Sequence, residues 1–178
     1  MEMKNIVKKF CGFSVGIIAV LTLIIICFYK FISMPDILIE NVILESSYIN
    51  YAWGFQYNGK VICDSGNIYS FSKSDRAAYV SASTDLETLN NYILSGDTKF
   101  VGRVNDKDLK TMKEHAKTID NNYTEAVSAG NDMGANVISI WDYDKNEKTL
   151  LKETGDWNKE NTSENAKKLN ELIEKYMK

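Results

Sequence analysis

Apolar residues fill the start of the chain without interruption. From Phe10 to Tyr29 the sequence holds twenty residues without a charge. A helix of that length rises about 1.5 Å per residue and covers the roughly 30 Å hydrocarbon core of a bilayer. A buried helix of a soluble protein rarely runs so far without a polar face. The pattern therefore predicts one transmembrane helix over residues 10–30.

The flanks of this segment predict an uncleaved, single-pass signal-anchor. The apolar run is longer than the about 7–15 residues of a secretory signal. It ends in Tyr29, Lys30 and bulky apolar residues, where a cleavage site needs small ones. Residues 1–9 hold three lysines and one acidic residue. By the positive-inside rule we expect residues 1–9 in the cytoplasm and residues 36–178 outside the cell membrane.

Residues 36–178 contain several segments with the period of a β-strand. Aromatic residues alternate with small or polar ones from Tyr51 to Tyr57, which predicts a strand with one aromatic face. Asn58-Gly59 follows, and this pair is a strong hairpin signal because both residues tolerate positive φ. The remaining predicted strands are residues 60–63, 68–72, 136–143 and 149–152, with shorter signals at 37–45 and 99–104.

Three other segments place apolar residues on one helical face. They cover residues 86–95, about 106–119 and about 163–177. Candidate N-caps are Thr84 or Asp85 for the first helix and Asn105 or Asp106 for the second. Residues 121–134 are polar and contain glycine, which is typical of a loop. The sequence thus predicts one α+β domain, with an antiparallel sheet of about five strands and about three helices on one face.

Composition narrows the class of protein. The chain has 21 Lys+Arg against 24 Asp+Glu, so it lacks the basic excess of a dedicated nucleic-acid-binding protein. Its 44% hydrophobic and 11% aromatic content is enough for a packed core and argues against disorder. Three cysteines cannot form a disulfide scaffold for 178 residues. Cys63 is the only cysteine beyond residue 35, and we expect it to be a small buried residue.

The sequence offers few parts for catalysis. Its single histidine, His115, lies in a Lys-rich helix without a second histidine or a cysteine nearby, so a zinc site or a Cys–His nucleophile is incomplete. We expect this histidine to face solvent. Nucleophile-elbow, P-loop and zinc-protease motifs are lacking. The sequence therefore favours a protein that is not an enzyme and needs no cofactor.

One acidic turn has the spacing of a calcium-binding loop. Asp142, Asp144 and Asn146, with Glu153 at the twelfth position, match the oxygen positions of an EF-hand. The sixth position needs glycine for its sharp turn, and Glu147 stands there. We interpret the segment as a polar hairpin turn and expect no metal.

The aromatic row is the candidate binding site. Tyr51, Trp53, Phe55 and Tyr57 fall on one face of the predicted strand. Such a row gives large contact area at low entropic cost, and it can hold a partner protein or a wall glycan. The same face can instead be covered by helices as part of the core. Because a sheet must bury one face under its helices, the sequence favours the core, and the binding row is kept as the alternative.

Two longer runs carry a resemblance. They are YAWGFQYNGKVICDSGNIYSFS, and NDMGANVISIWDYDKNEKTLLKETGDWNKENTSENAKKL near the C-terminus. Across most of residues 50–170 the chain resembles a family of small exported or membrane-anchored proteins of low-GC Gram-positive bacteria. The resemblance implies export and a single α+β domain. It implies no activity and no functional residues.

These observations favour a membrane-anchored extracytoplasmic protein whose domain binds an envelope protein or a wall component. Two alternatives remain: an extracytoplasmic enzyme that uses carboxylates, and an accessory subunit of a membrane complex. The enzyme requires a pocket with two convergent acids of perturbed pKa. The spacing Gly12-x-x-x-Gly16 allows close helix packing, and so a homodimer or an accessory role through the anchor.

Overall fold

The computed structural model describes residues 40–128, 130 and 133–177. The predicted cytoplasmic segment 1–9 and the predicted transmembrane helix 10–30 lie outside these residues. Within the part of the chain that is described, no helix is long and apolar enough to cross a membrane. The described residues belong to one compact unit that begins at Glu40.

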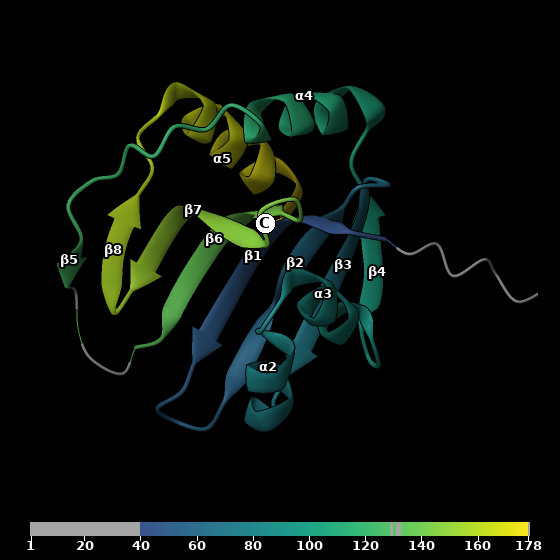
Figure 1. Cartoon of the computed structure of the whole chain (residues 1–178), viewed down its shortest axis with the longest axis vertical. Coiled ribbons are helices and arrows are strands. Elements are labelled where there is room, and N and C mark those ends of the chain that lie inside the picture. Colours follow the sequence, from purple (N-terminus) through teal and green to yellow (C-terminus); the bar gives the residue numbers. More distant parts are fainter. Residues whose placement is uncertain (1–39, 129, 131–132, 178) are drawn as a thin grey trace, which may run out of the picture. The chain divides into compact units, whose positions relative to one another are not determined.

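An eight-stranded antiparallel sheet runs through this unit (Figure 1). Its order is β4-β3-β2-β1-β6-β7-β8-β5, so two meanders meet where β1 pairs with β6. The strands are β1 (Val42–Asn50), β2 (Gln56–Cys63), β3 (Asn67–Lys73), β4 (Lys99–Arg103), β5 (Val127–Ser128), β6 (Ala135–Asp142), β7 (Glu147–Gly155) and β8 (Trp157–Glu160). The antiparallel α+β class is confirmed, but the prediction of about five strands is wrong. The strands β5 and β8 have only two and four residues, which is too few to show an alternating pattern.

The structure corrects the first predicted hairpin. Residues 51–55 are not a strand but the loop between β1 and β2, in which Gly54 has a φ of +90°. Asn58-Gly59 lies inside β2, where Gly59 pairs with Ser47 on β1 and Phe71 on β3. The glycine at 59 is needed for close approach of strands, not for a turn.

Four helices are found among the described residues. They are α2 (Arg76–Ala82), α3 (Leu86–Leu94), α4 (Asp106–Ala116) and α5 (Glu164–Met177). The side chains of Asp85 and Asn105 cap α3 and α4 by accepting the backbone N–H three residues on, as two of the predicted caps require. The helix α2 is additional to the three predicted ones, because its seven residues are too few to show a helical period.

Helices cover both faces of the sheet, so the prediction that they lie on one face is wrong. Val61 and Cys63 of β2 pack in one core cluster with α2 and α3. Ile62, between them, packs in a second cluster with α4 and α5. In Figure 1, α2 and α3 lie across β2 and β3. Three consecutive fully buried apolar residues in β2 are the sequence signature of a strand buried on both sides.

Gly59 gives the first test of this fold. A Cβ there would lie 2.7 Å from the Cα of Ser47 and would also collide with the carbonyl oxygen of Ser46. Because both obstacles are backbone atoms, Gly59→Ala should lower the free energy of unfolding by about 1–3 kcal/mol. Gly102→Ala in β4 is the matched control, since its Cβ meets only Ile68 at 3.9 Å. Thermal unfolding followed by circular dichroism measures both, and equal midpoints would contradict the close approach at Gly59.

Candidate functional site

The structure divides the predicted aromatic row into two pairs. Phe55 and Tyr57 are buried, with 9% and 2% of their surface exposed. Tyr51 is 48% exposed and Trp53 is 79% exposed in the loop between β1 and β2. Half of the row therefore belongs to the core, and the other half lies at the surface. We call residues 51–55 the aromatic loop.

Tilted and edge-to-face ring contacts connect the aromatic loop with the core. Tyr51 contacts Phe55 with ring centroids 5.6 Å apart, and Phe55 contacts Tyr79 of α2 at 5.1 Å. Tyr79 in turn lies 4.9 Å from Tyr57. The guanidinium of Arg76 lies over the exposed Tyr51 ring at 5.4 Å. These contacts fix one end of the loop on the sheet and on α2.

We call the rings of Tyr51, Phe55, Tyr57 and Tyr79 the aromatic cluster. Beside it, the sheet buries a charged carboxylate. Glu45 of β1 is 2% exposed. One of its oxygens accepts hydrogen bonds from Ser47 at 2.6 Å and Tyr57 at 2.7 Å. The other accepts from the indole of Trp141 at 2.9 Å and from the ammonium of Lys148 at 2.6 Å. Four donors from four strands thus surround this carboxylate.

The network favours the ionised form of Glu45. Burial raises the pKa of this carboxyl group, but the charge and hydrogen bond of Lys148, with the bonds from Ser47 and Tyr57, outweigh it. The net pKa therefore lies below the ordinary value. Burial and the nearby Glu45 charge raise the pKa of Tyr57 well above its usual range. The phenol consequently stays a hydrogen-bond donor at physiological pH.

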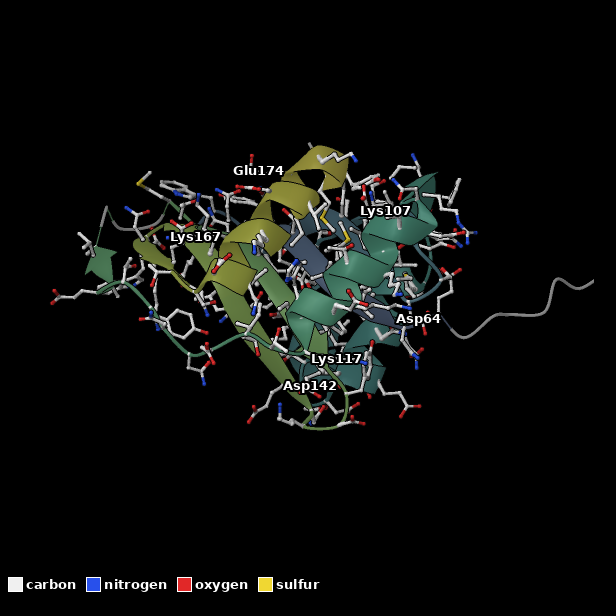
Figure 2. All side chains as sticks on the ribbon, turned by 90° about the horizontal axis from the view of Figure 1, so that it is seen from above. Asp64, Lys107, Lys117, Asp142, Lys167 and Glu174 are labelled. Atoms are coloured by element: carbon white, nitrogen blue, oxygen red, sulfur yellow. The ribbon has the colours of Figure 1, made fainter. Side chains whose placement is uncertain are left out.

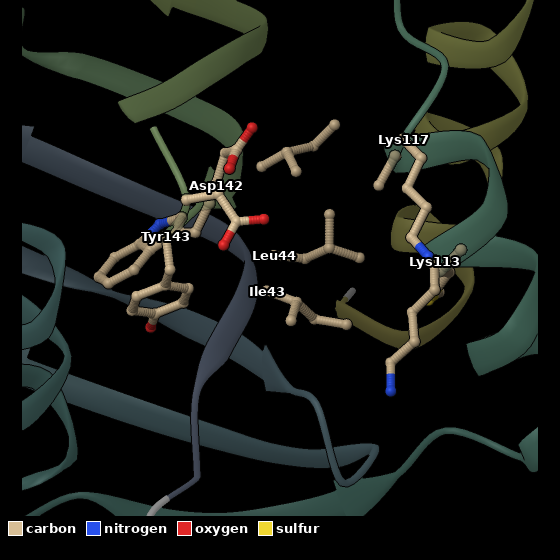
Figure 3. A pocket seen from close by; sticks show the side chains of 11 residues that line it. Ile43, Leu44, Lys113, Lys117, Asp142 and Tyr143 are labelled. Atoms are coloured by element: carbon tan, nitrogen blue, oxygen red, sulfur yellow. The ribbon is translucent and has the colours of Figure 1, made fainter. Parts of the chain in front are cut away.

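A cavity of about 420 Å³ lies against α4, and most of its apolar lining belongs to the core cluster that packs with α4 and α5. Its lining comes from β1, α4, the end of β6 and the turn before β7. Figure 3 shows Asp142 on one side of the cavity and two lysines on the other, with Ile43 and Leu44 between them. The lysines are Lys113 and Lys117, and Figure 2 shows Lys117 and Asp142 from above the helices.

The charged groups of this cavity differ in their partners. Lys113 donates to the carbonyl oxygen of Asp64 at 2.7 Å, and Asp142 accepts from Lys145 at 2.7 Å. The hydrogen bond and charge of Lys145 hold the pKa of Asp142 below its ordinary value. Asp144 is exposed at the rim. Asp142 thus carries a lasting negative charge, which suits ion pairing better than proton donation.

The other residues singled out from the sequence have structural surroundings. Cys63 is fully buried, as predicted, and burial raises the pKa of its thiol. His115 is half-buried and bonds to Asn165 of α5 at 2.9 Å, so it does not face solvent as expected. The segment from Asp142 to Glu147 forms the turn between β6 and β7, with Asn146 at a φ of 53°. Among the residues described, no three His, Cys, Asp or Glu side chains gather to hold a metal.

Comparisons of the chain with protein-family models, with curated proteins and with solved structures found no match. The resemblance to small exported proteins of low-GC Gram-positive bacteria therefore stays a prediction from the sequence.

The buried carboxylate gives a test by pH. Because the pKa of Glu45 is lower in the folded protein, its stabilising effect is complete above the ordinary value of 4.5 and is lost as the pH falls through the folded value. Glu45→Gln should remove this part of the acid dependence and lower the free energy of unfolding by about 3 kcal/mol at pH 7. Glu153→Gln, on the neighbouring strand β7, should change it by less than about 0.5 kcal/mol.

Urea unfolding of the parent and both variants between pH 3 and pH 7 measures these differences. The free energy of unfolding falls by about 1–3 kcal/mol per molar urea, so a difference of about 3 kcal/mol shifts the midpoint by at least about 1 M. A Glu45→Gln variant with the parent's pH profile would show that the buried carboxylate is not ionised.

Proposed function

We propose that this protein is a membrane-anchored extracytoplasmic binding protein. Residues 10–30 anchor it in the cell membrane, and the domain over residues 36–178 holds an envelope protein or a wall component through the aromatic loop. The high exposure of Trp53 carries this proposal. It is the most exposed of the large apolar side chains described in the domain.

Leaving a large aromatic side chain in contact with water is unfavourable, and such exposure is typical of a surface that a partner covers. Trp and Tyr are the side chains that contribute most binding energy per residue at protein interfaces. They combine a large apolar surface with a polar group, and they lose little rotamer entropy when they are covered. Tyr51 and Trp53, two residues apart in one loop, therefore supply the core of a contact site.

The loop is also held in shape before any partner arrives. Asn50 accepts a hydrogen bond from the backbone N–H of Ala52 at 2.8 Å and donates to the hydroxyl group of Tyr48 at 2.8 Å. On the other side, Phe55 packs into the aromatic cluster. A preorganised loop loses less entropy on binding, so more of the contact energy is available as affinity.

Binding by the aromatic loop can be tested by replacing its two exposed aromatic residues and, as a control, a tryptophan elsewhere on the surface. The full-length protein, solubilised in detergent, is used to capture partners from an envelope extract. Trp53→Ala and Tyr51→Ala should each weaken retention of the captured partner by at least about tenfold, because truncating an interface hot spot costs about 2 kcal/mol or more. The free energy of unfolding should change by less than about 0.5 kcal/mol for Trp53→Ala, since this side chain is exposed. Tyr51→Ala also removes the ring contact with Phe55 and should lower it by about 0.5–1.5 kcal/mol.

Trp157→Ala is the matched control, because this tryptophan is 51% exposed on β8. It should retain the partner as the parent does. If Trp53→Ala and Trp157→Ala bind equally well, the aromatic loop is not the contact site.

The orientation of the anchor can be tested on intact cells. A tag fused before Met1 should resist added protease, whereas a tag after Lys178 should be digested together with the domain. The reason is the excess of lysine in residues 1–9, which retains this end in the cytoplasm. Exchange of the three lysines in that segment for glutamate should reduce the protected fraction. A C-terminal tag recovered in the medium would instead show cleavage after the anchor.

The anchor also decides between a free-standing protein and the accessory subunit considered above. Gly12 and Gly16 allow close packing against a second helix. Exchange of both for leucine should abolish co-purification of a membrane partner or of a second copy, if either packs there.

A further inference from the structure

We propose that the cavity between α4 and the β6–β7 turn binds a small zwitterion, in particular a short apolar peptide with a free amino group and a free carboxylate. The cavity is separate from the aromatic loop, because its lining includes none of residues 51–55. The proposal therefore does not depend on the partner-binding role of that loop.

The size of the cavity suits a small molecule. Its volume of about 420 Å³ lies within the roughly 300–1,000 Å³ that small-ligand sites occupy. The floor is apolar and consists of residues from the sheet and the helix. These residues are Ile43, Leu44, Met112, Ala116 and Ile140. An apolar floor with a few polar groups at its margins is the usual composition of such a site.

The charges at the margins are of opposite sign and come from different elements. Lys113 lies in the last turn of α4, and Lys117, four residues later, is the residue that caps the end of this helix. Asp142 and Asp144 come from the end of β6 and the turn after it. Figure 3 shows the two lysines and Asp142 on opposite sides of the apolar floor. A ligand that spans the floor thus meets cations at one end and carboxylates at the other.

Two of these four groups are available for a ligand. Lys113 is engaged by the carbonyl of Asp64, and Asp142 is engaged by Lys145. The ammonium of Lys117 makes no hydrogen bond or ion pair with any residue that the structure describes, and the carboxylate of Asp144 is exposed. Lys117 is therefore the group for the ligand's carboxylate, and Asp144 is the group for its ammonium. Lys113 adds a second positive charge beside Lys117, whereas the charge of Asp142 is paired with Lys145.

The arrangement favours a zwitterion over other small ligands. A simple anion would lie against Lys117 but would make no use of Asp144, and a simple cation would do the reverse, because Lys113 and Asp142 already have partners. A neutral apolar molecule would cover the floor and leave both charged margins without partners. Only a ligand with both charges, held apart by an apolar body, matches all three parts of the lining.

The tripeptide Ala-Leu-Ala is a suitable probe, because its leucine can contact the floor while its termini reach the margins. Isothermal titration calorimetry with the full-length protein in detergent should show saturable one-to-one binding with a Kd below about 1 mM. The N-acetylated and the C-amidated forms of the peptide, which each lack one charge, should bind at least about tenfold more weakly.

Variants then assign each end. Lys117→Gln should bind the free peptide and its C-amide equally, because the partner of the carboxylate is lost. Asp144→Asn should bind the free and the N-acetylated peptide equally, for the corresponding reason. Lys107→Gln on α4 and Asp97→Asn before β4 are matched controls, since neither residue lines the cavity (Figure 2 labels Lys107). Both should bind as the parent does.

Circular dichroism is used to check that each variant is folded. We expect this, because Lys117 and Asp144 are exposed. The proposal is wrong if the folded parent gives no saturable binding at 10 mM peptide. It is also wrong if both blocked peptides bind as tightly as the free one. Trp53→Ala should leave peptide binding unchanged, so failure of this proposal and failure of the aromatic loop are seen in separate measurements.

Discussion

The structure depends on one buried charge, the carboxylate of Glu45. This group lies on the central strand β1 and accepts hydrogen bonds from Ser47, Tyr57, Trp141 and Lys148. A buried carboxylate without partners destabilises a protein by several kcal/mol, and the four donors offset this cost. The donors come from both meanders of the sheet. A shift of one residue in the register of β1 would turn Glu45 to the opposite face, away from Tyr57, Trp141 and Lys148, which lie on other strands.

The same network positions both candidate sites. Tyr57 donates to Glu45 and packs against Phe71 and Tyr79, and through these rings it supports the aromatic loop. Trp141 also donates to Glu45, and it lines the cavity at the end of β6. One interaction at the sheet centre thus restrains the ends of two strands that carry surface features. The aromatic loop and the cavity are thus both linked to the same buried carboxylate.

Local patterns predicted the elements that depend on local interactions. The caps Asp85 and Asn105 and the turn after Asp142 were found because each is encoded within a few residues. Gly59 was misread as part of a turn, since its role is a close approach to Ser47, a contact that sequence spacing does not reveal. The helix α2 and the strands β5 and β8 are too short for a period to be visible. Placement of helices on both faces follows from tertiary packing, although the apolar run Val61–Cys63 carries a signal for it.

The two candidate sites also differ in how far the sequence predicts them, because one is made of neighbouring residues and the other of distant segments. The aromatic loop could be named from the sequence because its residues are neighbours, but only the structure separates exposed Trp53 from buried Tyr57. The cavity could not be found, because α4 and the β6–β7 turn are brought together only by packing on the sheet. A faint signal was present in the spacing of Lys113 and Lys117, which places two cations on one helical face. The acidic pair at 142 and 144 was weighed as a calcium loop and interpreted as a polar hairpin turn, since its counterpart of opposite charge lies in a distant segment. Sites made of complementary charges are therefore the ones that a linear reading misses, because each half alone is indistinguishable from an ordinary solvated surface.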